Sequence, residues 1–305
     1  MEKINLTSGG GEGEFILPGF SDQPQLELVL FLVVLISYLL TLVGNSVIVP
    51  VSGLNSKLHT PMYFFLTNLS FLVICFTTSI VPAIVDPDGT GQDHHIHWLC
   101  HTTLRVTLDG STECVLTVMA FDRYVAVCRP LKYTAVMYPP FCKSLAGISC
   151  LIGVVNSLIQ STVILHLTRF GNHHFHQFFC EVATMIKLAC VDISKNFVAT
   201  LVLILLPVAL ILVSYGLIQA VIKIKSAQAW RKVLETCCSH LLVASLFFGI
   251  SSATYIQPKL SYDHSQGKFL ILFYTVVTPT LNLLIYTLRN KNVKGALKRL
   301  LRGEN

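Results

Sequence analysis

Seven long stretches of mostly apolar residues, separated by short polar segments, dominate the pattern of hydrophobic and polar positions along this chain. A helix needs about 20 such residues to cross the hydrocarbon core of a bilayer, and each stretch reaches that length. We therefore predict an all-α fold, a seven-transmembrane helix bundle with a short amphipathic C-terminal helix. The predicted spans cover residues 28–51, 60–85, 98–121, 143–166, 197–222, 237–257 and 269–288.

The composition also indicates a membrane protein. Of the 305 residues, 53% are hydrophobic and 12% are charged, whereas about 25% are charged in an average soluble domain. So few charged side chains cannot cover the surface of a soluble protein of this length. The 18 Gly and 12 Pro residues are too few for a disordered or collagen-like chain.

The distribution of basic residues predicts the orientation in the membrane. With the N-terminus outside, 15 Lys and Arg residues fall on the cytoplasmic side and six outside, with Arg105 in a span. Basic residues favour the cytoplasmic side, so residues 1–27 should be extracellular and residues 289–305 cytoplasmic. Residues 28–288 then form the membrane domain.

The cytoplasmic tail has its own pattern. Apolar residues recur at helical spacing between basic ones, which predicts a short amphipathic helix on the anionic inner leaflet. A frayed basic tail is the alternative. The apolar positions are Val293, Ala296, Leu297, Leu300 and Leu301.

Several sequence strings together resemble the olfactory (odorant) receptors of the rhodopsin-like G-protein-coupled class. The second span opens with LHTPMYFF at 58–65, and the third span closes with MAFDRYVAVC at 119–128. FFCE lies at 178–181, SHL at 239–241 and NLLIYTLRN at 282–290. The strings occur in the same order as in the family and cover nearly the whole chain.

The resemblance implies a plasma-membrane receptor that binds a small, volatile and mostly apolar ligand. Its protein partner would be a heterotrimeric G protein of the olfactory Gs type, which raises cAMP. We expect no enzymatic activity, because a His-Glu-x-x-His motif is absent. We expect no cofactor, metal or nucleic-acid partner, since the histidines of the outer loops match no compact metal motif.

The same resemblance assigns a switch that engages the G protein when the sixth span moves outward. At the end of the third span an Arg stays charged and can pair with its neighbouring carboxylate or with an incoming partner. A simple positive-inside anchor is the alternative. The switch residues are Asp122, Arg123, Tyr124, Asn282 and Tyr286.

Two features concern the extracellular side. Asn5 begins an Asn-Leu-Thr glycosylation sequon, which is usable if the N-terminus is outside. Cys100 and Cys180 would both be exposed to an oxidising compartment, and the resemblance pairs them in a disulfide. Cys190 is then left over, because Phe170 stands where the family has the other cysteine of a second pair.

The resemblance places the ligand pocket between the third, fifth, sixth and seventh spans, although helix packing is an alternative role for each residue. Arg105, Asp109 and Glu113 share one stripe of the third span, where charges normally face the bundle interior. Of these three, the family pattern includes only Glu113. The pocket residues are Val106, Thr107, Asp109, Gly110, Phe248, Ser251, Tyr255 and Thr275.

The chain also departs from the family pattern. Val73 replaces an Asp of the second span, Leu283 replaces the Pro of the seventh-span motif and Cys150 replaces a Trp. The third span is one residue shorter on each side of Glu113, and one missing residue rotates the rest of a helix by about 100°. Two alternatives therefore remain: a signalling-deficient pseudoreceptor, and a small membrane transporter, against which no internal repeat is found.

Overall fold

The computed structural model describes residues 24–54, 59–85, 92–170, 194–222 and 237–249, together with 252, 278–281 and 285. These residues form helices joined by short turns, and none of them lies in a β-strand. The predicted all-α fold is therefore confirmed for the part of the chain that the structure describes.

The first three helices follow the first three predicted spans. Helix α1 (Pro24–Leu54) and helix α2 (Pro61–Val85) are almost entirely apolar, and α2 begins with the proline that suits a first helical position. Helix α3 (Gln92–Cys128) is longer and less apolar, and it continues two turns beyond residue 121. Asp122, Arg123 and Tyr124 therefore lie within a continuous helix.

A short connection follows α3. The 3-10 turn η2 (Pro130–Lys132) and helix α4 (Tyr133–Val136) reverse the chain before helix α5 (Pro139–Phe170) begins. Helix α7 (Ser194–Ile222) contains Pro207. Residues 237–249 form a further helix, here called the sixth-span helix, and residues 278–281 are also helical.

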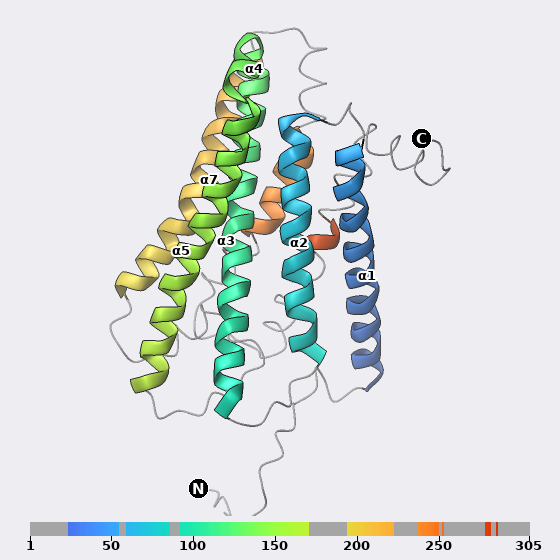
Figure 1. Cartoon of the computed structure of the whole chain (residues 1–305), viewed down its shortest axis with the longest axis vertical. Helices are drawn as coiled ribbons and strands as arrows, with labels where there is room; N and C mark the ends of the chain where they lie inside the picture. The colour runs from blue at the N-terminus through green and yellow to red at the C-terminus, as the bar shows by residue number, and fades with distance from the viewer. Residues whose placement is uncertain are drawn as a thin grey trace, which may run out of the picture.

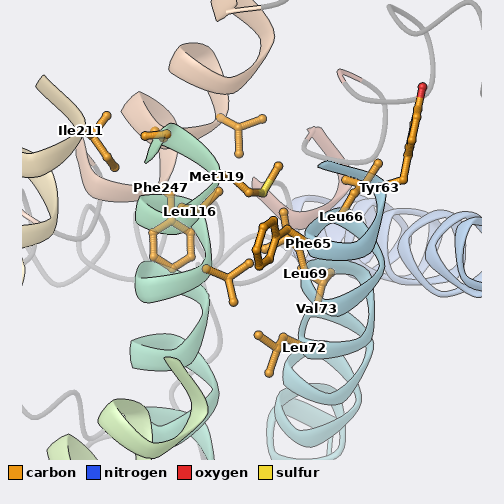
Figure 2. Close-up of a cluster of buried hydrophobic side chains, with 14 of the residues drawn as sticks. Tyr63, Phe65, Leu66, Leu69, Leu72, Val73, Leu116, Met119, Ile211 and Phe247 are labelled. Atoms are coloured by element: carbon orange, nitrogen blue, oxygen red, sulfur yellow. The ribbon is translucent and has the colours of Figure 1, made fainter. Parts of the chain in front are cut away.

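Helix α3 lies at the centre of the arrangement. It packs against α2, α5 and α7, while α1 packs on the outer side of α2 (Figure 1). Phe65 of α2 points toward Leu116 and Met119 of α3, and all three side chains are fully buried (Figure 2). In a bilayer such contacts hold helices together by van der Waals packing rather than by the hydrophobic effect.

The outer faces of the helices are apolar as well. Within the described residues, three segments are long and apolar enough to cross a membrane: Leu32–Gly53, Pro61–Ser79 and Pro139–Thr162. Large apolar side chains such as Leu151 and Leu158 of α5 and Val213 of α7 are exposed. An exposed apolar surface of this extent indicates contact with lipid. The limits of the spans relative to the bilayer remain predictions.

Helices α3 and α5 approach each other closely along a seam of small and polar residues. A Cβ atom added at Gly153 of α5 would lie 2.5 Å from the carbonyl oxygen of Thr107 and 2.8 Å from the backbone nitrogen of Ser111. Farther along, Thr103 Oγ1 lies 2.6 Å from Ser161 Oγ, and Ser157 donates to the Thr103 carbonyl at 2.6 Å. Small residues allow this approach, and the hydroxyl groups join the two helices.

Candidate functional site

At the C-terminal end of α3, Asp122 is held by the connection that follows the helix. The hydroxyl of Tyr133, the first residue of α4, donates a hydrogen bond of 2.8 Å to Asp122 Oδ1. The turn that brings Tyr133 back is closed by a backbone bond of 3.0 Å from Lys132 N to Arg129 O. Asp122 is only 2% exposed, so this bond satisfies a buried carboxyl group.

The environment changes the acidity of both partners. Burial raises the pKa of Asp122, and the Tyr133 hydrogen bond and the Arg123 charge lower it only in part. Burial and the adjacent Asp122 carboxylate raise the pKa of the Tyr133 hydroxyl. Tyr133 therefore stays a hydrogen-bond donor at every physiological pH.

Arg123 points away from this pair and toward α2. Its guanidinium group contacts the thioether sulfur of Met62. The buried Nε atom of Arg123 has no hydrogen-bond partner among the residues that the structure describes. A buried guanidinium nitrogen without a partner is costly, so the Nε–H of Arg123 is a donor whose hydrogen-bonding capacity is not used by the described residues.

A second polar link joins α3 to the sixth-span helix and α7. His240 Nε2 lies 3.0 Å from the carbonyl oxygen of Leu116, and the Tyr215 hydroxyl lies 2.8 Å from His240 Nδ1. A carbonyl oxygen can only accept, so Nε2 carries the proton and Nδ1 accepts from Tyr215. Tyr124 packs against the nearby buried pair Ile218 and Cys237.

Sequence reasoning did not assign roles to Tyr133, Tyr215, His240 or Met62. These residues are far apart in the chain, and 124 positions separate His240 from Leu116. The SHL string that contains His240 carried the resemblance, but nothing in its spacing indicated a bond to α3. Asn282 and Tyr286, the other predicted switch residues, lie outside the described residues.

In the interior, one small cavity lies between α2, α3, the sixth-span helix and residues 278–281. Asp109, a predicted pocket residue, lies in its wall. Phe248, also predicted, is buried and packs edge-on against Phe247 with ring centroids 5.7 Å apart. The wall consists of Val73, Phe76, Asp109, Thr112, Phe247, Thr278 and Pro279.

Two predicted pocket residues lie on the opposite side of α3. A Cβ atom at Gly110 would lie 3.2 Å from Asn156 Nδ2 of α5, and the Thr107 carbonyl faces Gly153. The structure thus places them at the α3–α5 seam, apart from Asp109. Val106 is half-buried on α3. Ser251, Tyr255 and Thr275 lie outside the described residues, so the pocket as a whole remains a prediction.

The extracellular predictions also remain untested. Cys100 is exposed near the start of α3, while Cys180, Cys190 and Asn5 lie outside the described residues. The disulfide and the glycosylation site therefore remain predictions. In the described part of the chain, no three His, Cys, Asp or Glu side chains are grouped so that they could hold a metal ion.

Comparisons with known proteins agree with this arrangement. A family model described as olfactory receptor matches residues 34–304. The chain is 50% identical to olfactory receptor 2G6 of Homo sapiens over 310 residues, which covers 99% of this chain and 97% of the relative. It is 53% identical to olfactory receptor 2C1 of Mus musculus over 307 residues, which covers 98% of each. The chain therefore belongs to the olfactory receptor family of G-protein-coupled receptors.

Proposed function

We propose that this receptor binds a small, mostly apolar volatile molecule within its helix bundle and activates a heterotrimeric G protein of the Gs type, raising cAMP. Family membership makes the chain a seven-helix receptor of the plasma membrane, and neither an enzyme nor a transporter. Beyond family membership, we propose the class of ligand, the Gs type of G protein and the orientation in the membrane. In that orientation the N-terminus lies outside and the C-terminus lies in the cytoplasm.

The state of Arg123 is the observation that carries the proposal. Its Nε atom is buried without a hydrogen-bond partner among the described residues. The carboxyl group of the neighbouring Asp122 accepts a hydrogen bond from the Tyr133 hydroxyl. Arg123 therefore has donor capacity for carbonyl groups at the end of a G-protein helix. Such a contact would satisfy the guanidinium group and favour the coupled state.

The link through His240 supports a moving sixth-span helix. Its bonds to Leu116 and Tyr215 hold the sixth-span helix beside α3 in the structure described here. Outward movement of that helix would break the bond to Leu116 and open the space beside Arg123. A ligand that favours the open arrangement then shifts the population toward it.

The connection between α3 and α5 offers a further contact. Leu131 in η2 is 98% exposed, and the neighbouring Arg129 and Lys132 are exposed as well. An apolar side chain that protrudes from a basic turn at the cytoplasmic face suits an apolar pocket on a protein partner. We assign Leu131 to contact with the G protein.

A cell assay tests the proposal. Cells that express the wild-type receptor with an N-terminal tag should stain without permeabilisation, and they should raise cAMP in response to a mixture of short-chain alcohols, aldehydes, ketones and esters. The Arg123→Ala variant should reach the surface equally well and lose the response. No cAMP change from a surface-displayed wild-type receptor, beside a responding control receptor, would favour the signalling-deficient alternative.

The positions that depart from the family pattern supply the test of that alternative. If decay of the switch removed signalling, a Val73→Asp/Leu283→Pro double variant would respond where the wild type does not. A response from the wild type, with no gain in the double variant, would exclude the alternative.

A further inference from the structure

The interior cavity brings together two positions at which the chain departs from the family pattern. The resemblance places an aspartate where Val73 stands on α2, and no acidic residue where Asp109 stands on α3. Val73 and Asp109 both lie in the wall of the same cavity. The position at which α2 lacks a carboxylate and the position at which α3 has an additional one therefore line the same cavity.

Two hydroxyl groups lie in the wall of the cavity, those of Thr112 on α3 and of Thr278. The Thr112 hydroxyl donates to the Leu108 carbonyl at 2.8 Å, so its oxygen is left to accept from a water molecule or from a protonated carboxyl group. The cavity has room for about one water molecule. The opposite wall, with Val73, Phe76 and Phe247, is apolar.

Charges of both signs lie beside Asp109 on α3. Arg105 lies one turn away as the opposite charge, and Glu113 lies one turn away on the other side as a like charge, on the same stripe of the helix. An intramembrane carboxylate is normally found facing the bundle interior with polar partners, since an isolated one costs several kcal/mol. An accidental Asp on the lipid-facing side of α3 would have none of these neighbours.

We propose that Asp109 supplies from α3 the carboxyl group that Val73 does not supply from α2, and that it acts as a positioning residue for the cytoplasmic switch. This inference rests on the proposed receptor function. The polar connection in the bundle then runs from α3 directly to the helix that contains Thr278, with α2 as an apolar neighbour. The two departures compensate each other, and the receptor remains competent to signal.

A charge-transfer experiment between helices tests the proposal. Four receptors are compared at equal surface display: wild type, Asp109→Asn, Val73→Asp/Asp109→Asn, and Leu72→Asp/Asp109→Asn as the matched control. Leu72 neighbours Val73 and is equally buried, but it is not part of the cavity wall. Asp109→Glu is added as the conservative variant.

Two measurements are made on each receptor. One is recruitment of a Gs α-subunit without added ligand, and the other is the cAMP response to the odorant mixture named above. Asp109→Asn should lower recruitment and maximal cAMP at least fivefold. Val73→Asp/Asp109→Asn and Asp109→Glu should restore both to within about twofold of wild type, and the Leu72 control should not. If Asp109 only contacted the odorant, the substitution would change only the odorant concentration at which cAMP rises. Recruitment measured without ligand therefore distinguishes the two roles.

Three results would overturn the proposal. Asp109→Asn could behave as wild type, the Val73→Asp double variant could stay as impaired as Asp109→Asn, or the Leu72 control could rescue equally well. A wild-type receptor that is displayed but neither recruits the α-subunit nor raises cAMP contradicts the proposed function itself, and this inference with it. A variant that is not displayed is replaced by the same comparison in purified receptor, where recruitment is measured per folded molecule.

Discussion

The hydroxyl of Tyr133 donates a hydrogen bond of 2.8 Å to Oδ1 of Asp122, so the carboxyl group next to Arg123 is engaged by α4. This bond connects the turn that follows α3 to the predicted switch residues of α3. It also leaves Arg123 oriented toward Met62 of α2. The contact gives a direct way to change the availability of Arg123 without altering Arg123 itself.

Tyr133→Phe should lower the G-protein response. Without the hydroxyl donor, Asp122 becomes the nearest partner for the Arg123 guanidinium, which then competes with the G protein for Arg123. Hydrogen bonds to charged groups contribute about 1.5–3 kcal/mol, so maximal cAMP should fall roughly tenfold at equal surface display. The Tyr133→Phe/Asp122→Asn double variant should recover part of the response, because Asn cannot form the ion pair. No recovery in the double variant would contradict this explanation.

The raised pKa of Asp122, which lies beyond the predicted third span, makes a second prediction. A carboxyl group whose pKa is raised on folding binds its proton more tightly in the folded state. Its contribution to stability is therefore full below the unfolded pKa of about 4 and is lost as the pH rises through the folded pKa. Asp122→Asn removes this loss, so the melting temperature of the variant should rise relative to wild type as the pH is raised above about 4. Purified receptor in detergent, followed by thermal unfolding at each pH, provides the measurement, and a constant difference would contradict it.

Removal of the Tyr215 hydroxyl should increase basal signalling. Tyr215→Phe deletes the donor to His240 Nδ1 and weakens the link that holds the sixth-span helix beside α3. A neutral hydrogen bond contributes about 1 kcal/mol, so ligand-free cAMP should rise about fivefold at equal display. His240→Phe should have at least as large an effect because it also removes the bond to Leu116. Unchanged basal cAMP in both variants would show that this link does not restrain the helix.

A single methyl group at Gly153 should impair folding. The added Cβ of Gly153→Ala would meet the Thr107 carbonyl and the Ser111 backbone nitrogen, neither of which can move without shifting α3. Strain of this kind typically costs about 1–3 kcal/mol, so surface display should drop several-fold. Gly147→Ala on the same helix is the matched control, since no atom lies within 4 Å of its added Cβ. Equal display of both variants would mean that the α3–α5 seam can widen freely.

Leu131→Ala should separate coupling from folding. The side chain is almost fully exposed and contributes little to the packing of η2, so display and thermal stability should match wild type. If Leu131 inserts into a pocket of the G protein, recruitment of the α-subunit should fall at least tenfold, as for a buried interface anchor. A large loss of display would instead assign the residue to the fold.

Hydrophobic patterning predicted the helices well because a bilayer restricts the chain to few structures. Apolar stretches of about 20 residues can satisfy their backbone groups in lipid only as helices or in closed barrels. The extension of α3 through Arg123 to Cys128 was less accessible to this reasoning, because the charged residues Asp122 and Arg123 interrupt the apolar run. The DRY string predicted a switch, but it did not predict the hydrogen-bond partners of Asp122 and Arg123.

Side-chain partners could not be predicted because they depend on the rotation of each helix. One residue along a helix corresponds to about 100°, so neighbouring positions face different helices. Asp109 lies at the interior cavity, whereas Gly110 faces Asn156 of α5. The sequence suggested both as pocket residues, and only the packing separates them. Glu113, Leu116 and Asp122 of α3 are all buried, although nine positions separate Glu113 from Asp122 and place them on opposite faces of the helix.

The hydroxyl-bonded seam between α3 and α5 has a consequence for where motion can occur. Thr103, Ser157 and Ser161 join the two helices by direct bonds, and Gly153 allows backbone contact beside them. Sliding or separation of α3 from α5 would break several interactions at once, so the pair forms a rigid frame. On the other side of α3, a hydrogen bond between His240 and Leu116 joins α3 to the sixth-span helix. If the sixth-span helix moves as proposed, the frame formed by α3 and α5 provides the fixed reference against which it moves.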